Sequence, residues 1–153
     1  MKFLVQLKDT PVLWPIYMAA IGWAAFAFVS QSWPASWWLD VRSVHVNDSK
    51  VGHKVTMNVD RAIKRNFQAV WNVSVRKVED GSDSVFCTAS SMSEYRPGAE
   101  LPKNLSLDWW ADGRCDALPV GRYFVSTAWR IESSGMLPSK RVQIDSNIFE
   151  VLP

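Results

Sequence analysis

The sequence predicts an all-β domain, an antiparallel sandwich of about seven strands, preceded by one transmembrane helix. Two observations support this fold class. Residues 11–29 contain no charged side chain, and beyond residue 40 the apolar residues tend to recur at every second position. A period of two is typical of strands, because successive side chains of a strand point to opposite faces of the sheet. No second helical pattern competes with it.

The apolar segment, residues 11–29, is long enough to cross a bilayer. As a helix it would extend about 28 Å, close to the thickness of the hydrocarbon core. Thr10 is a suitable N-cap and Pro11 suits the first helical position, whereas Pro15 either starts the helix or kinks its first turn. We expect a cytoplasmic N-terminus (residues 1–10), a transmembrane helix (11–30), an interfacial connector (31–40) and an extracytoplasmic β-sandwich (41–153).

Aromatic and basic residues flank this segment as they do in membrane-spanning helices. Tryptophan and tyrosine favour the membrane interfaces. Such residues lie at both ends of the segment: Trp14, Tyr17, Trp33, Trp37 and Trp38. Lys2 and Lys8 precede the segment and Arg42 is the first basic residue after it, which favours a cytoplasmic N-terminus and a periplasmic or extracellular domain.

A cleaved signal peptide is the main alternative for the N-terminal segment. A basic start followed by an apolar run is also its pattern, and Ala25-Phe26-Ala27 imitates a cleavage site. The apolar run is long for that role and rich in aromatic residues, so we favour an uncleaved anchor. A buried helix of a soluble domain is the third interpretation. Ala20 and Ala24 have the small-residue spacing that lets membrane helices approach closely.

The charge balance and the cysteines indicate which partners and which cellular compartment to expect. The chain has 17 Lys and Arg residues against 15 Asp and Glu residues, a balance that gives no reason to expect nucleic acid. Its two cysteines, Cys87 and Cys115, both follow the apolar segment. In an oxidising compartment they would form a disulfide that contributes about 3–4 kcal/mol through loop closure. Two reduced thiols in a cytoplasmic domain are the alternative.

The first strands follow from alternation. A short strand is expected over residues 41–46, and a second over residues 51–59. On the second, one face carries Val51, His53, Val55, Met57 and Val59. Residues 67–75 form the clearest strand, with an apolar face that we expect to point inward: Phe67, Ala69, Trp71, Val73 and Val75.

Turn residues separate the later strands. Residues 79–82 are expected to form a turn, in which Gly81 allows a positive φ, and a strand over residues 84–90 follows. A fifth strand starts at Leu105, and a sixth covers residues 123–131. The seventh covers residues 141–151. Its apolar residues change face along the strand, so we expect a β-bulge near Asn147.

Several of these residues resemble an immunoglobulin-like or fibronectin type III domain. They are Trp71 in the third strand, Leu105-x-Leu107 in the fifth, and LPVGRYFV at residues 118–125 leading into the sixth. The resemblance covers about residues 41–151 and implies that Trp71 is the core tryptophan of such a domain. It also implies that Tyr123 is the corner tyrosine, whose hydroxyl bonds a nearby backbone group. Trp129, on the alternating sixth strand, completes the expected structural core.

The chain departs from true immunoglobulin domains in its cysteines. The positions that such domains use for the inter-sheet disulfide are occupied here by Met57 or Val55 and by Val125. The resemblance therefore identifies a scaffold and no activity.

Patterns for catalysis and metal binding are weak. His45 and His53 are the only histidines, and neither lies in an HxxxH or paired-cysteine arrangement. The sequence has no GxSxG motif and no glycine-rich phosphate loop. The acidic residues Asp108, Asp112 and Asp116 would need a controlled separation across a cleft to act as a glycosidase. We expect no enzyme activity, no metal and no cofactor.

The candidate binding surface is the segment LDWWADGR, residues 107–114. Trp109 and Trp110 would point to opposite faces of a strand, so one of them is exposed or lies under a loop. Beside Asp112 and Arg114, an exposed tryptophan suits a protein or glycan partner. Alternatively, this tryptophan covers a sheet edge or rests on the membrane.

These observations predict a membrane-anchored, extracytoplasmic binding module that is not an enzyme. Its expected partners are the lipid bilayer and a protein or glycan of the envelope, and no nucleic acid. An accessory subunit of a larger membrane complex is the alternative, in which the helix itself is the interface. A small envelope hydrolase is less favoured. A chain of this size also fits a bacteriophage-encoded envelope protein.

Overall fold

The computed structural model describes residues 13–99, 102, 104–107, 115, 117–132 and 139–153. Within these residues the chain forms an α-helix, a short 3-10 helix and nine strands. The elements are α1 (Leu13–Ser32), η2 (Ala35–Trp37), β1 (Leu39–Val46), β2 (Ser49–Lys50), β3 (Thr56–Ile63), β4 (Phe67–Glu79), β5 (Ser82–Tyr95), β6 (Asn104–Ser106), β7 (Gly121–Glu132), β8 (Lys140–Asp145) and β9 (Phe149–Leu152).

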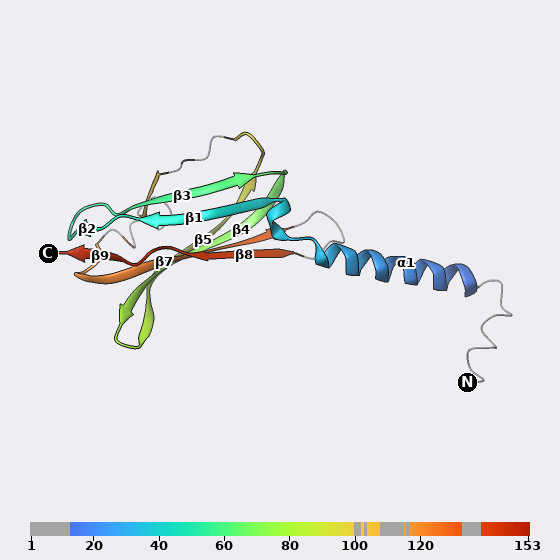
Figure 1. The fold of residues 1–153 in the computed structure, drawn as a ribbon, viewed down its shortest axis with the longest axis horizontal. Helices are drawn as coiled ribbons and strands as arrows, with labels where there is room; N and C mark the ends of the chain where they lie inside the picture. The colour runs from blue at the N-terminus through green and yellow to red at the C-terminus, as the bar shows by residue number, and fades with distance from the viewer. Residues whose placement is uncertain (1–12, 100–101, 103, 108–114, 116, 133–138) are drawn as a thin grey trace.

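The strands form two sheets, an arrangement compatible with a β-sandwich. A three-stranded sheet has the order β1-β3-β6 and a six-stranded sheet has the order β2-β9-β7-β4-β5, with β8 also paired to β7. All neighbours are antiparallel except β2 and β9. Figure 1 shows β1 and β3 in one layer and β4, β7 and β8 in the other. The predicted predominance of antiparallel strands is confirmed.

The helix α1 leaves one end of the sheets and extends away from them (Figure 1). It is long and apolar enough to cross a membrane, and it lies near the N-terminus of the chain. Nearly all of its side chains are exposed, including Trp14, Trp23 and Phe28. Such an exposed apolar surface is unfavourable in water and favourable in hydrocarbon. The helix is therefore a candidate membrane span, as the sequence predicted.

The core between the sheets consists of two clusters of buried residues. The larger contains Val44, Val46, Val55, Met57, Val59, Val73, Val75, Cys87, Leu105, Leu107, Cys115, Leu118, Tyr123, Val125, Phe149 and Val151. The smaller contains Leu39, Phe67, Ala69, Tyr95, Trp129 and Ile131. Trp71 is half-buried and packs against both clusters, with its indole N–H donating to Ser93 Oγ at 3.1 Å. Trp71 thus joins the two parts of the core.

The alternation predicted for residues 67–75 is present in β4. Phe67, Ala69, Val73 and Val75 are buried, and the residues between them are exposed or half-buried. The predicted turn at residues 79–82 links β4 to β5, and Gly81 has φ 81°. Only glycine adopts that backbone conformation without strain.

The strand predicted over residues 51–59 is wrong in its first half. Val51 is 48% exposed, and His53 N–H donates to Lys50 O in a turn around Gly52, whose φ is 80°. The chain leaves the three-stranded sheet after β1, pairs briefly as β2 with β9, and returns as β3 at Thr56. A glycine in the left-handed region allows this return, and the simple alternation pattern did not reveal it.

The last predicted strand is two strands, and the expected β-bulge is an interruption at residues 146–148. β8 and β9 pair with different parts of β7. Ser146 N–H donates to Val125 O at 2.8 Å, and Ser146 Oγ accepts from Val125 N–H at 2.9 Å. The predicted change of face is present, since Phe149 and Val151 are buried.

Asn147, in this interruption, connects the two sheets. Its Oδ1 accepts from Val46 N–H at 2.8 Å and its Nδ2 donates to Val46 O at 2.9 Å. Val46 is the last residue of β1, which belongs to the other sheet. The amide therefore pairs with the β1 backbone as a neighbouring strand would.

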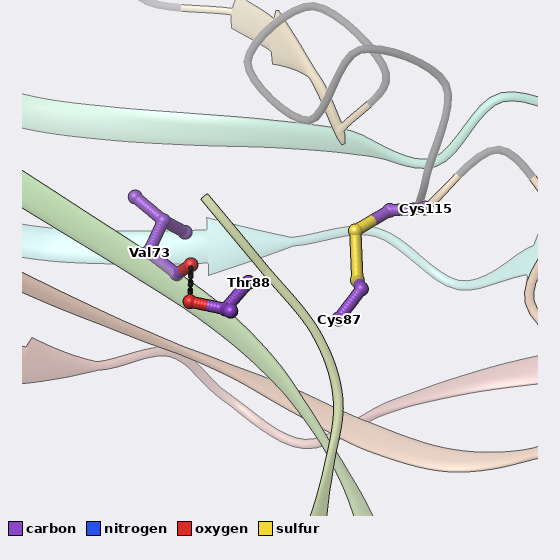
Figure 2. Close-up of a disulfide and its surroundings, with 4 residues drawn as sticks. All are labelled: Val73, Cys87, Thr88 and Cys115. Carbon is purple, nitrogen blue, oxygen red and sulfur yellow. Dashed lines mark hydrogen bonds between the residues drawn. A yellow bond between two sulfur atoms is a disulfide. The ribbon is translucent and has the colours of Figure 1, made fainter. Parts of the chain in front are cut away.

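The disulfide joins Cys87 in β5 to Cys115, with a Cα–Cα distance of 6.0 Å (Figure 2). Both cysteines are buried in the larger core cluster. The neighbouring Thr88 donates its hydroxyl to Val73 O at 3.2 Å, which links β5 to β4 beside the bridge. The predicted bridge is thus present, and it ties the six-stranded sheet to the connection between β6 and β7.

Candidate functional site

The segment predicted as the binding surface is only partly described. Trp109, Trp110, Asp112 and Arg114 lie outside the residues that the structure describes. Both flanking residues are buried: Leu107 donates its N–H to Val55 O at 3.0 Å, and Cys115 forms the disulfide. The segment is therefore held to the core at its two ends.

The structure shows a different candidate site, a groove on the outer face of the six-stranded sheet. It has a volume of about 380 Å³ and is lined by residues of β4, β7 and β8. The floor consists of small side chains, Asn72, Ser74, Ser126 and Ala128, and the longer side chains are Val70, Arg76, Arg130, Arg141 and Gln143. We call this the outer-face groove.

Strand pairing brings these residues together. Val70 pairs with Arg130, which pairs with Arg141 on the next strand. In the neighbouring row, Asn72 pairs with Ala128, which pairs with Gln143. These residues point outward because the alternate residues of β4 and β7, such as Val73 and Trp129, fill the core. Small side chains in the middle of longer ones leave a hollow.

The charges around the groove are partly neutralised. Arg130 donates to Glu132 at 2.7 Å, and Arg76 forms an ion pair with Asp83. Arg141 donates to the Gln143 side chain at 2.9 Å and has no carboxylate partner within the described part of the chain. Its guanidinium can therefore bind an acidic group of a ligand by donating charge-assisted hydrogen bonds, which are strong.

Apolar side chains extend the outer-face groove on two sides. Met92, the β5 partner of Val70, is 62% exposed. Phe124, the β7 partner of Arg76, is half-buried on the same face. A surface that combines amides, hydroxyls, a guanidinium and a few apolar groups is suited to binding a polar partner.

Among the described residues that line the groove, none is His, Asp, Glu or Cys. The resolved pKa shifts belong to residues elsewhere. Hydrogen bonds from Gln68 and Arg96 lower the pKa of Glu94, and burial raises the pKa values of Tyr95 and Tyr123. These are the effects expected of an exposed ion pair and of core tyrosines.

The histidines do not form a metal site in the described ranges. His45 is exposed on β1, and His53 is exposed in the turn after β2. A smaller hollow beside His53 is lined by Asp48, Ser49, Lys50 and Leu152, but Asp48 Oδ1 already accepts from Glu150 N–H at 2.7 Å. No group of three His, Cys, Asp or Glu side chains that could hold a metal is present among the described residues.

The expected core residues occupy interior positions. Tyr123 is fully buried, and its hydroxyl donates to Pro119 O at 2.9 Å. Its ring stacks on Phe149 with centroids 5.9 Å apart. Trp129 is buried in the smaller cluster.

The expected interfacial aromatics lie at both ends of α1. Trp14 and Tyr17 are exposed near its start. Beyond its end, Trp33 and Trp37 stack with centroids 4.9 Å apart, while Trp38 packs against the smaller core cluster.

No protein-family model and no curated protein matches this chain. The outer-face groove was not found from the sequence. Asn72, Ser74 and Arg76 alternate with the predicted inward face of residues 67–75. Arg130 and Arg141 join them only through the pairing of β4, β7 and β8. Local sequence does not specify that pairing.

Proposed function

We propose that this chain is a single-pass membrane protein whose extracytoplasmic domain binds an envelope partner through the outer-face groove, without catalysing a reaction. The single observation that supports it most directly is the groove itself, built on paired strands and lined by hydrogen-bonding groups. One of these is the Arg141 guanidinium, which has no carboxylate partner among the described residues. The volume of the groove, about 380 Å³, is within the usual range of ligand sites.

Two features support an extracytoplasmic domain. The disulfide between Cys87 and Cys115 is typical of oxidising compartments. Lys2 and Lys8 precede the apolar helix, which by the positive-inside rule favours a cytoplasmic N-terminus. Expression in a bacterium, followed by proteolysis of spheroplasts and titration of free thiols, tests both features. A membrane-bound product that is digested from outside and lacks free thiols is expected. A soluble product with two free thiols would contradict the proposal.

We also propose that the domain is immunoglobulin-like. The supporting observation is Tyr123, whose hydroxyl reaches back to the backbone of Pro119 at the start of the strand. A tyrosine corner of this kind is typical of immunoglobulin-like sandwiches. An experimental structure of the domain tests this proposal through its strand order.

The partner that the groove fits best is a glycan with an acidic group. Hydroxyls of a sugar match the side chains of Asn72, Ser74 and Gln143, and a carboxylate matches Arg141. The full chain in detergent can be tested on an array of acidic and neutral oligosaccharides. We expect acidic oligosaccharides to bind and Arg141→Ala to weaken their binding about tenfold or more, since hydrogen bonds to charged groups contribute about 1.5–3 kcal/mol.

A matched control lies on the same face of the same sheet. Arg122 is on β7, outside the groove, in an ion pair with Glu150 at 3.9 Å. Arg122→Ala removes the same charge and should leave binding unchanged. Ser74→Gln fills the floor and should weaken binding without a change in charge. Equal effects of Arg141→Ala and Arg122→Ala would contradict a site in the groove.

An accessory subunit of a membrane complex is the second candidate function. Ala20 and Ala24 lie one turn apart on α1, and both are exposed. Small residues at this spacing let two membrane helices pack closely. If helix association is the function, Ala20→Leu should abolish co-purification of a membrane partner, whereas Arg141→Ala should not.

A further inference from the structure

The end of the domain from which α1 emerges carries an aromatic and basic surface. Trp33 and Trp37 stack there with centroids 4.9 Å apart. The Arg65 guanidinium lies 5.0 Å from the centroid of the Trp37 ring, a cation–π contact. Lys140, at the start of β8, lies at the same end. We call Trp33, Trp37, Arg65 and Lys140 the collar.

The collar is fixed to both the helix and the sheets. Lys140 Nζ donates to Gln31 O in the last turn of α1 at 2.6 Å. In the connector, Trp38 O accepts from Lys64 N–H at 2.9 Å, and Lys64 Nζ lies 3.1 Å from Asp40 Oδ2. These contacts connect the region of the collar both to the end of α1 and to the strands.

Among the described residues at this end of the domain, the basic side chains are in excess of the acidic ones. The acidic residues here, Asp40, Asp60, Glu94 and Glu132, are each in an ion pair with a basic residue. Arg65 and Lys140 have no carboxylate partner among the described residues, and both are accessible. Their charges are therefore available to an external anion.

We propose that the collar binds the phosphate groups of anionic phospholipids at the membrane surface and so holds the domain in a defined orientation on the bilayer. The inference rests on the proposal that α1 spans the membrane, because the collar follows the end of that helix directly. Tryptophan favours the headgroup region. A basic residue near an anionic surface strengthens binding about fivefold.

The partner is the bilayer rather than a free phosphate because of the position of the collar. Figure 1 shows α1 leaving the domain at the end where β1 and β8 begin, with the C-terminus at the opposite end. A helix that crosses the bilayer therefore brings this end to the headgroups. The stacked rings of Trp33 and Trp37 add an amphipathic surface, which suits lipid headgroups and is not required for binding a soluble anion.

The test uses the full chain reconstituted in phosphatidylcholine vesicles that contain a trace of spin-labelled lipid. The fraction of probe lipid immobilised next to the protein is compared for phosphatidylglycerol and phosphatidylcholine at low salt. We expect a preference for phosphatidylglycerol, and we expect Arg65→Gln/Lys140→Gln to reduce that preference about fivefold or more. High salt should reduce it as well, because exposed charges are screened.

A matched control removes the same charge from the opposite end of the domain. Lys50 is exposed on β2, and Arg122 lies near the start of β7. Lys50→Gln/Arg122→Gln should leave the lipid preference as it is in the unmodified chain. Lys2 and Lys8 are present in every variant, so their effect cancels in the comparison.

Each outcome separates the collar from the anchor. A chain that stays in the vesicles after carbonate extraction but shows no preference for phosphatidylglycerol would overturn the proposal that the collar binds anionic lipid. Equal loss of preference in the collar and control variants would overturn it too. A chain that carbonate extracts from the vesicles would overturn the membrane anchor itself. Far-ultraviolet circular dichroism of each variant confirms that the strands are intact.

Discussion

Asn147 provides a direct test of how the two sheets are held together. Its side-chain amide makes both hydrogen bonds that a neighbouring strand would make to Val46, at 2.8 and 2.9 Å. Val46 is only 1% exposed, whereas Asn147 is exposed, so water can reach these backbone groups from one side once the amide is removed. The Asn147→Ala variant would leave the Val46 N–H and C=O without their side-chain partners.

The expected cost follows from those two groups. A buried polar group left unpaired costs about 1–3 kcal/mol. Two such groups set an upper limit of about 6 kcal/mol, and because water can partly replace the exposed amide we expect Asn147→Ala to lower the free energy of unfolding by about 2 kcal/mol. Asn147→Asp retains an acceptor for Val46 N–H but loses the donor to Val46 O. We expect its cost to be at least that of one unpaired group.

Urea unfolding of the full chain in detergent, followed by tryptophan fluorescence, measures this free energy. The matched control is Asn47→Ala. Asn47 is exposed next to Val46, and its side-chain amide donates to the Thr56 hydroxyl at 3.3 Å. We expect the control to cost less than about 0.5 kcal/mol, as surface substitutions usually do. An Asn147→Ala variant as stable as the control would refute the proposed connection between the sheets.

Three further predictions concern the core. Replacing Cys87 and Cys115 by serine opens a loop with a sequence separation of 28 and should cost about 3.5 kcal/mol; an unchanged melting temperature under oxidising conditions would contradict this. Trp71→Ala should cost about 3–5 kcal/mol, because Trp71 packs against both core clusters, and wild-type melting would show that it does not join them. Burial raises the pKa of Tyr95, so the unfolded chain ionises first. The contribution of Tyr95 to stability should be constant below about pH 10 and be lost above it, so stability should fall less steeply above pH 10 in Tyr95→Phe; identical slopes in urea titrations would contradict this.

The parts of the fold that the sequence predicted depend on local patterns. The inward face of residues 67–75 follows from strict alternation, and the turn around Gly81 follows from a glycine where φ is positive. The apolar helix is also a local property, because length and composition alone define a candidate span. Each of these features is encoded within one short stretch of chain.

The features that the sequence did not predict depend on pairing between distant segments. The strand predicted over residues 51–59 begins only at Thr56. Before it the chain pairs as β2 with β9, about a hundred residues later in the sequence, and then turns around Gly52. The irregularity near Asn147 was expected, but its hydrogen bonds to Val46, at a sequence separation of 101, were not. The outer-face groove depends on three strands, β4, β7 and β8. Since alternation assigns faces but not neighbours, it cannot place residues of different strands side by side.

Strand β8 links the two proposed binding surfaces. Lys140 bonds the last turn of α1, while the next residue, Arg141, lines the outer-face groove. Consecutive residues of a strand point to opposite faces of the sheet. The same short strand therefore presents Lys140 to the membrane-proximal end of the domain and Arg141 to the groove. If both proposals hold, an oligosaccharide bound at Arg141 lies at the membrane-proximal end of the domain. We therefore expect bound ligand to protect Arg141 from arginine-modifying reagents in vesicles, while the distal Arg122 remains reactive. Protection of both residues would show that the ligand binds elsewhere or covers the whole face.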